Sequence, residues 1–454
     1  MDAITGINGN VNLLACFLFL LMPFLIIGFF ELEKPSKIFA LIGCIGNLIF
    51  LAILQTRAAL VGMGVTSLSI FLMYVIYKKN VPFKQIILWM TITFFASAAL
   101  IFFFRSNLSE ISSRDVNGIL SAKSFEPRKL LWKKSFQMFE DHPIAGVGAG
   151  NWRTNLPNYT LTGFIDEVQN GQLIPDRPHN DFLWTLSETG LIGFFSQVAI
   201  FILLIGYAYK VLNRNGFSWR LVIPLSSLLG YLTISMFSFP KERIESVVMV
   251  NIIMGLLYAF IQTEITFPAS FKLSIQPTYI RVIGASFLLV ILFFGLIRAK
   301  GEYYARKLIS ARQIGDFKNV IYYSNKSISL FYKLDNFGIP ISWYRGSAYI
   351  SMEDYENALH SFSEAYMVAP FNIQVLNNLA SSLEVLGYHE KAKSIYLEAI
   401  RISPGFEDPK LNLAAIYYNE GNYRTALQWT QSVAGNGERK QKYKELIYGK
   451  INKR

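Results

Sequence analysis

Polar and charged residues stand directly before a long apolar run in the middle of the sequence. Residues 177–190 read RPHNDFLWTLSETG, and LIGFFSQVAIFILLIGYAY follows them. A charged side chain near the centre of a bilayer costs about 2.5–3.5 kcal/mol, so ionisable residues at the mouth of a membrane helix require a reason. The four ionisable residues of this stretch therefore mark a candidate reaction site: Arg177, His179, Asp181 and Glu188.

His179 is the residue of this stretch best suited to proton transfer. It lies just before the apolar run, between Arg177 and Asn180, and its near-neutral pKa allows it to accept a proton from an attacking hydroxyl. A single histidine is often structural, so the functional interpretation rests on the position of His179 rather than on its residue type. Glu188 lies about two turns into the run, where pairing with an arginine is a commoner fate than chemistry.

Two arginines are candidates for binding an anion. Arg57 lies between two apolar runs in QTRAALVG. It either contributes to a binding site or only extends its charged group to the membrane interface. Arg128 begins RKLLWKKSFQMFEDHP, and Trp132 follows one helical turn later on the same face. The planar fork of an arginine suits a phosphate group at the membrane surface.

The segment that follows Arg128 has the pattern of a helix lying in the membrane interface. One face is expected to carry Leu131, Trp132, Ser135, Phe136 and Phe139, and the opposite face Lys129, Lys133 and Lys134.

The stretch GVGAGNW at 146–152 lacks the GxGxxG spacing and the preceding strand of a dinucleotide site. Its glycines are expected to allow tight backbone turns. The sequence shows no zinc-like ligand cluster and no Ser-His-Asp set, and we expect neither a metal nor a cofactor.

The composition indicates a membrane protein of the all-α class. The chain of 454 residues is 52% hydrophobic and only 16% charged. Apolar runs of about 17–25 residues fit the hydrocarbon core of a bilayer. Eight such runs predict a polytopic helical bundle: Val11–Phe30, Ile38–Leu54, Ala58–Tyr77, Ile86–Phe104, Phe182–Tyr207, Leu221–Phe237, Val247–Ile261 and Ile280–Ile297.

The formal net charge of +12 reflects membrane orientation rather than nucleic-acid binding. Alternate connections contain nine basic residues: Lys34, Lys37, Lys78, Lys79, Lys84, Lys210, Arg214, Arg220 and Lys272. The short connections on the other side contain Arg57, Lys241 and Arg243. The positive-inside rule then places the first set in the cytoplasm and the loop 105–181 and the tail outside.

The tail repeats itself at a spacing of 34 residues. Gly346, Ala380 and Ala414 coincide in the alignment, as do Ala358, Ala392 and Ala426. This pattern resembles the tetratricopeptide repeat and predicts an α-solenoid that recruits a protein partner or holds an acceptor chain. We therefore expect four regions, namely spans at 1–104, an outer loop at 105–181, spans at 182–298 and repeats at 299–454.

Four motifs in this order resemble the O-antigen ligase and polymerase family. They are GINGNVNLLA, TRAAL, RKLLWKKSFQMFEDHPIAGVGAGNW and PHNDFLWTLSETGLIG, within residues 5–210. The family commonly has ten to twelve spans, whereas this chain shows eight and starts at its GNVN motif. Either further helices precede this motif in a longer protein, or this is a reduced form.

The resemblance implies a glycosyltransferase of the bacterial cytoplasmic membrane. Family members take a glycan from an undecaprenyl diphosphate carrier on the outer face of that membrane. Carried over by motif, Arg57 and Arg128 would bind the donor diphosphate, and His179 would assist the acceptor hydroxyl. Trp132, Arg177, Asn180 and Glu188 would support them. The acceptor is a saccharide, a lipid or a protein.

Other functions remain open at this stage. A protein O-oligosaccharyltransferase would share every one of these motifs. A polysaccharide transporter would favour interrupted spans in paired halves, which the sequence does not show. A non-enzymatic assembly scaffold would need the repeats and an anchor, but not the arginine and histidine motifs.

The charge distribution makes a direct prediction about topology. A reporter fused after Leu330 should read as outside the cytoplasmic membrane, because the basic loops hold the opposite side of the bundle in the cytoplasm. Paired alkaline phosphatase and green fluorescent protein fusions measure this. A cytoplasmic signal at Leu330 would overturn the orientation.

Overall fold

The computed structural model describes residues 11–54, 56–78, 126–264 and 276–452. These residues form helices joined by turns, with two isolated β-bridges and no β-strand among them. The all-α class predicted from the sequence is confirmed. The expected span Ile86–Phe104 lies outside the described residues.

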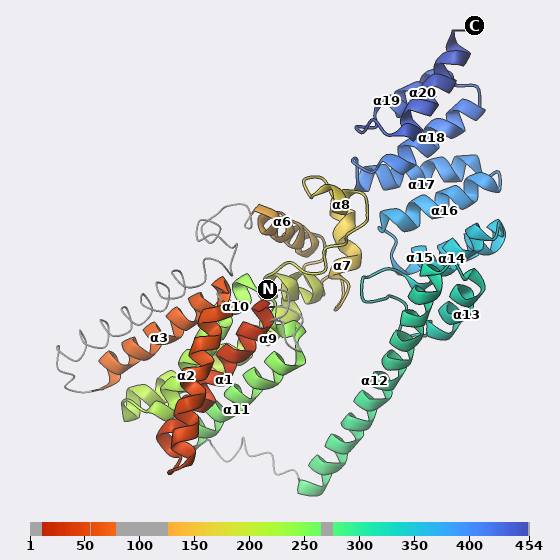
Figure 1. Cartoon of the computed structure of the whole chain (residues 1–454). Helices are drawn as coiled ribbons and strands as arrows, with labels where there is room; N and C mark the ends of the chain where they lie inside the picture. The colour runs from red at the N-terminus through yellow and green to blue at the C-terminus, as the bar shows by residue number, and fades with distance from the viewer. Residues whose placement is uncertain (1–10, 55, 79–125, 265–275, 453–454) are drawn as a thin grey trace. The chain divides into compact units, whose positions relative to one another are not determined.

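The helices follow one another as labelled in Figure 1. Up to residue 264 they are α1 (Val11–Glu31), α2 (Ser36–Leu54), α3 (Arg57–Tyr77), α6 (Glu126–Asp141), α7 (Trp152–Asn155), η3 (Leu156–Tyr159), α8 (Asp166–Gln169), α9 (Asp181–Asn215), α10 (Trp219–Phe237), η4 (Pro240–Glu242) and α11 (Ile244–Glu264). Beyond it they are α12 (Pro277–Gln313), α13 (Phe317–Ser327), α14 (Ile341–Ser351), α15 (Tyr355–Val368), α16 (Ile373–Val385), α17 (His389–Ile402), α18 (Glu407–Asn419), α19 (Tyr423–Gln431) and α20 (Glu438–Ile451).

Seven of the described helices are long and apolar enough to cross a membrane. They are α1, α2, α3, α9, α10, α11 and most of α12. All seven coincide with runs predicted from the sequence, including the short run Val247–Ile261, which lies within α11. The chain is a membrane protein.

The chain divides into two compact units. The first contains α1–α3, α6 as far as Trp132, residues 143–146 and the chain from Arg177 through α11. The second contains α6 from Lys133, the loop 147–176, and the chain from α12 to the C-terminus.

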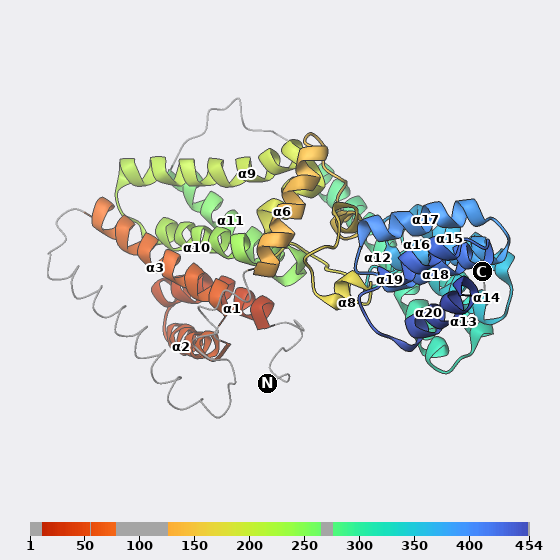
Figure 2. The same cartoon turned by 90° about the horizontal axis from the view of Figure 1, so that it is seen from above.

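Helix α10 is the centre of the first unit. It packs against α1, α3, α9 and α11, and it is the most buried of the membrane-spanning helices (Figures 1 and 2). A Cβ atom at Gly62 of α3 would lie 2.6 Å from the Ile234 side chain and 3.1 Å from the Gly230 carbonyl oxygen. The absence of that atom lets α3 and α10 approach closely, as small residues do between membrane helices.

The second unit contains the predicted repeats. The end of α12 packs against α13, and the pairs α14–α15, α16–α17 and α18–α19 follow in a stack that α20 completes (Figure 1). Ala358, Ala392 and Ala426, which recur every 34 residues, have no exposed surface. Gly346 leaves room for the Phe362 ring, which would lie 2.7 Å from a Cβ atom there. Small residues at the repeat spacing therefore let paired helices pack tightly.

The lysine face predicted for α6 is wrong at one position. Lys134 is buried rather than exposed, because the loop folds back over it and its Nζ donates a hydrogen bond to the Tyr159 carbonyl oxygen. Burial lowers the pKa of Lys134, and the neighbouring charge of Lys133 lowers it further. Phe136, which was expected on the apolar face, is 46% exposed.

Candidate functional site

Arg128 and Trp132 meet the end of α10 together. One helical turn separates them on α6, so their side chains lie on one face, as the sequence predicted. Arg128 Nη1 donates a hydrogen bond to the Phe237 carbonyl oxygen at 3.2 Å, and the Trp132 ring lies 6.4 Å from the Phe237 ring. Trp132 Nε1 also donates to the Pro178 carbonyl oxygen at 2.8 Å. These contacts bring the motif of α6 to the stretch that contains His179.

Arg57 and Arg128 are close enough to affect one another. Arg57 is exposed at the start of α3, and Arg128 is half-buried. Burial lowers the pKa of Arg128, and the positive charge of Arg57 lowers it further. Two guanidinium groups that repel each other are stabilised by an anion placed near both.

His179 is held in an unusual backbone conformation against an aromatic ring. Its φ of 55° is in the left-handed region, which few non-glycine residues adopt. Its imidazole packs edge-on against the Phe239 ring, with centroids 4.9 Å apart. The guanidinium of Arg177 lies 4.3 Å from the centre of the same ring and forms an ion pair with Glu242. Phe239 therefore fixes both side chains relative to α10.

Asn180 and Asp181 anchor the start of α9. Asn180 is the N-cap, and its side-chain oxygen accepts a hydrogen bond from the Leu183 N–H at 3.0 Å. Asp181 is 2% exposed, and its Oδ2 accepts a hydrogen bond from the Lys241 backbone N–H at 3.0 Å. This bond joins the start of α9 to η4, the turn that presents Phe239.

Lys241 is a residue that sequence reasoning did not place in the site. Its Nζ donates to Thr185 Oγ1 at 3.0 Å and lies 4.4 Å from the centre of the Trp184 ring. Burial lowers the pKa of Lys241, whereas the charges of Asp181 and Glu188 raise it. The ammonium thus lies near two buried carboxyl groups. The available signal in the sequence was its position beside Arg243 in a short connection between two apolar runs.

The glycine-rich stretch packs against α9, where the helix is distorted. Gly190 has non-helical angles, with φ of 60°, and the Leu191 N–H donates to the Pro143 carbonyl oxygen at 2.8 Å. A Cβ atom at Gly146 would overlap the backbone of Glu188. Gly146, Gly148 and Gly150 all have positive φ, which confirms the tight turns predicted from the sequence.

The structure thus places six predicted residues in the first half of α6 or at the starts of α3 and α9, near the end of α10. They are Arg57, Arg128, Trp132, Arg177, His179 and Asn180. Glu188 lies deeper along α9, is 7% exposed and faces Lys241. Within the described residues, no group of three or more His, Cys, Asp or Glu side chains is placed to hold a metal ion.

Two parts of the chain match models of known families. Residues 39–198 match the family model described as O-antigen ligase. The chain carries an O-antigen ligase domain. Residues 345–372 and 373–406 match the tetratricopeptide repeat model, which confirms the repeats downstream of the ligase domain.

Other similarities cover a minor part of the chain. A segment of 105 residues is 32% identical to the BBSome complex member BBS4 of Bos taurus. The match covers 22% of this chain and about a fifth of that protein's length. Two structures of MamA, one of them the MSR-1 C2 form, show 16% and 15% identity with TM-scores of 0.27 and 0.28. Each match covers 34% of this chain, and 86% and 87% of the respective MamA chain.

The buried charges around Lys241 make a prediction about stability. Lys241→Met should destabilise the protein by about 3 kcal/mol, because it removes the ammonium group that lies near the buried carboxyl groups of Asp181 and Glu188. Lys210→Met, at an exposed position on α9, should have little effect. Thermal unfolding in detergent measures both.

A second substitution separates charge from packing. Adding Asp181→Asn to Lys241→Met should recover part of the lost stability, since it removes one of the two buried carboxylates near the lost ammonium group. Equal melting temperatures for the single and the double variant would show that the two side chains are not coupled.

Proposed function

We propose that this protein is a membrane glycosyltransferase of the O-antigen ligase type. It transfers a glycan from an undecaprenyl diphosphate carrier to a saccharide or lipid acceptor on the outer face of the bacterial cytoplasmic membrane. The match of residues 39–198 to the ligase family supports the class of activity. The observation that carries the proposal is the pair Arg57 and Arg128 at helix ends, in the same unit as His179.

The two arginines would bind the donor diphosphate. The carrier places its diphosphate at the membrane surface, where the start of α3 and the start of α6 present Arg57 and Arg128. Their mutual repulsion favours an anion between them, and guanidinium groups bind phosphate oxygens in bidentate fashion. Trp132 and Phe237 provide aromatic surface beside Arg128. Arg177 is neutralised by Glu242, so its role is to position His179 through Phe239.

His179 would serve as the general base. Its imidazole accepts the proton of the acceptor hydroxyl while that oxygen forms a bond with the anomeric carbon. The bond from the anomeric carbon to the carrier diphosphate breaks, and the leaving diphosphate keeps the electron pair. Arg57 and Arg128 stabilise the negative charge that grows on it. Direct displacement inverts the anomeric configuration, and the step needs no metal.

Arg128→Lys is expected to weaken donor binding about tenfold, because the lysine keeps the charge but loses the planar fork. Binding of undecaprenyl diphosphate to the purified protein in detergent measures this. Arg214→Lys, at an exposed position at the far end of α9, is the matched control and should bind normally. Unchanged affinity in Arg128→Lys would remove this residue from the diphosphate site.

His179→Ala is expected to bind undecaprenyl diphosphate normally but to transfer about 10²–10⁴-fold more slowly, the usual range for one acid–base group. Transfer is measured in a deletion strain, where the lipid-linked glycan accumulates unless the complementing variant is active. His142→Ala, an exposed histidine of the same loop, should complement fully. Full complementation by His179→Ala would leave this histidine with a structural role.

A further inference from the structure

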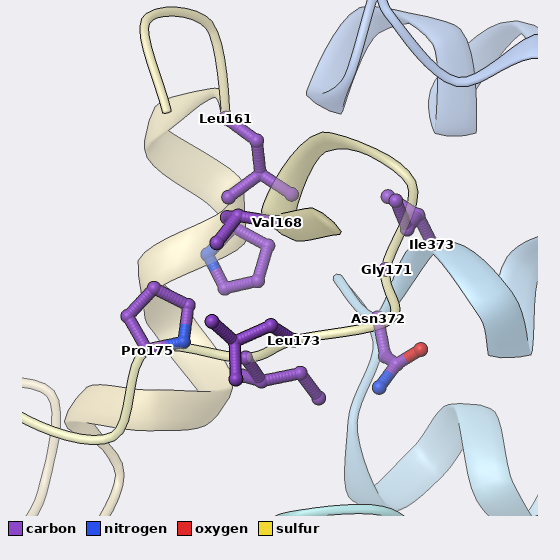
Figure 3. Close-up of a pocket in the computed structure, with 9 residues that line it drawn as sticks. Leu161, Val168, Gly171, Leu173, Pro175, Asn372 and Ile373 are labelled. Atoms are coloured by element: carbon purple, nitrogen blue, oxygen red, sulfur yellow. The ribbon is translucent and has the colours of Figure 1, made fainter. Parts of the chain in front are cut away.

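The outer loop and the repeats share one hydrophobic cluster. Leu161 and Val168 of the loop are 4% and 3% exposed. They pack with residues of the second repeat and the turn after it, namely Ile373, Leu376, Ala399, Ile402 and Phe406. Figure 3 shows the loop lying against the start of α16, with Leu161 and Val168 on one side and Ile373 on the other. All of these residues belong to the second unit.

Three hydrogen bonds fix the loop backbone to this edge. The Leu161 N–H donates to the Ile402 carbonyl oxygen at 2.7 Å. Ser403 Oγ donates to the Gln169 carbonyl oxygen at 2.6 Å, and Gln374 Nε2 donates to the Asn170 carbonyl oxygen at 2.7 Å. Ile402 is the last residue of α17, so no N–H group of the helix donates a hydrogen bond to its carbonyl oxygen. The loop therefore supplies a hydrogen-bond donor to the end of α17 and also buries apolar surface.

Gly171 shows how closely the two segments approach. Its φ of 71° is in the left-handed region, and a Cβ atom there would lie 3.0 Å from the side chains of both Ile373 and Gln374. A small apolar pocket remains beneath it, lined in part by Leu173, Pro175 and Asn372 (Figure 3). The fit at this point requires a residue without a side chain.

The loop buries part of its apolar surface only through this contact. Between the end of α6 and the start of α9 it contains three short helical turns, α7, η3 and α8, of four residues each. Such short elements cannot bury Leu161 and Val168 among themselves, and the repeats provide the missing apolar partners. Asp176, the last loop residue of this unit, is followed directly by Arg177, and His179 lies two residues further on.

We propose that the edge of the repeats formed by α16, α17 and Phe406 is a docking surface for the chain's own ligase-domain loop. Docking fixes residues 156–176 and thereby restricts the backbone that leads into Arg177 and His179. The repeats thus act on the site through the loop, and an acceptor or partner protein that displaces the loop would change transfer. The control of transfer by the repeats rests on the proposed function, whereas the docking of the loop does not.

Substitutions on the loop side test the docking without altering the repeats. Leu161→Asp and Gly171→Val are made in the full-length protein, with Ile165→Asp as the matched control because Ile165 is 58% exposed in the same loop. Hydrogen–deuterium exchange in detergent should become roughly tenfold faster over residues 156–176 in both variants and stay normal in the control. Exchange in α13–α15 should not change, which shows that the repeats remain folded.

Substitutions on the repeat side give the reciprocal test. Ile402→Asp should also accelerate exchange in residues 156–176, whereas Leu397→Asp, at a 44% exposed position of α17, should not. Unchanged loop exchange in both Leu161→Asp and Ile402→Asp would overturn the docking.

Transfer is then measured with the same variants in the deletion strain. Leu161→Asp and Gly171→Val should leave roughly tenfold more lipid-linked glycan than the wild type, and Ile165→Asp should complement fully. Accelerated loop exchange with normal complementation would refute the control of the site by the repeats. If the wild-type protein also failed to relieve accumulation, the proposed function would fall, and the exchange data would still decide whether the loop docks.

Discussion

The hydrogen bond between the Asp181 carboxylate and the Lys241 N–H is the interaction on which the arrangement of the site depends. It joins the start of α9 to η4 at a position where the carboxyl group is almost completely buried. A buried carboxylate needs a donor, and η4 supplies both the backbone N–H and a nearby ammonium group. Because η4 is fixed in this way, Phe239 lies where it contacts both His179 and Arg177.

The cations of the site are therefore of two kinds. Lys241 and Arg177 lie beside carboxylates of the same unit, with Lys241 near Asp181 and Arg177 paired with Glu242. Arg57 and Arg128 instead repel one another, and Arg128 contacts a backbone carbonyl group. An anion placed near two cations that repel each other is bound by both of them. This difference separates the residues that we assign to the donor from those that hold the base in place.

The loop between α6 and α9 connects this chemistry to the repeats through one continuous chain. The second unit contains the loop and the repeats together, with a shared cluster around Leu161 and Ile402. Repeat domains of this kind generally present extended surfaces to partners. Here the α16–α17 edge is covered by the ligase domain's own loop, so this part of the solenoid binds a segment of the same chain.

The sequence by itself determined the elements. Apolar runs, the 34-residue spacing and the glycines of residues 146–150 are local patterns, and the helices, repeats and turns follow them closely. The shared face of Arg128 and Trp132 was also predictable, since helical geometry fixes which residues lie one turn apart.

The tertiary structure decided which of these elements meet. Lys241 is 60 residues from Asp181 along the chain, and Ile402 is far from Leu161, so no local spacing reveals either contact. Lys134 was assigned to an exposed face because a helical pattern cannot show that a distant part of the loop, at Tyr159, covers it. Periodicity shows which residues share one face of a helix. It cannot show which part of the chain covers that face, because tertiary packing brings together residues that are remote in sequence.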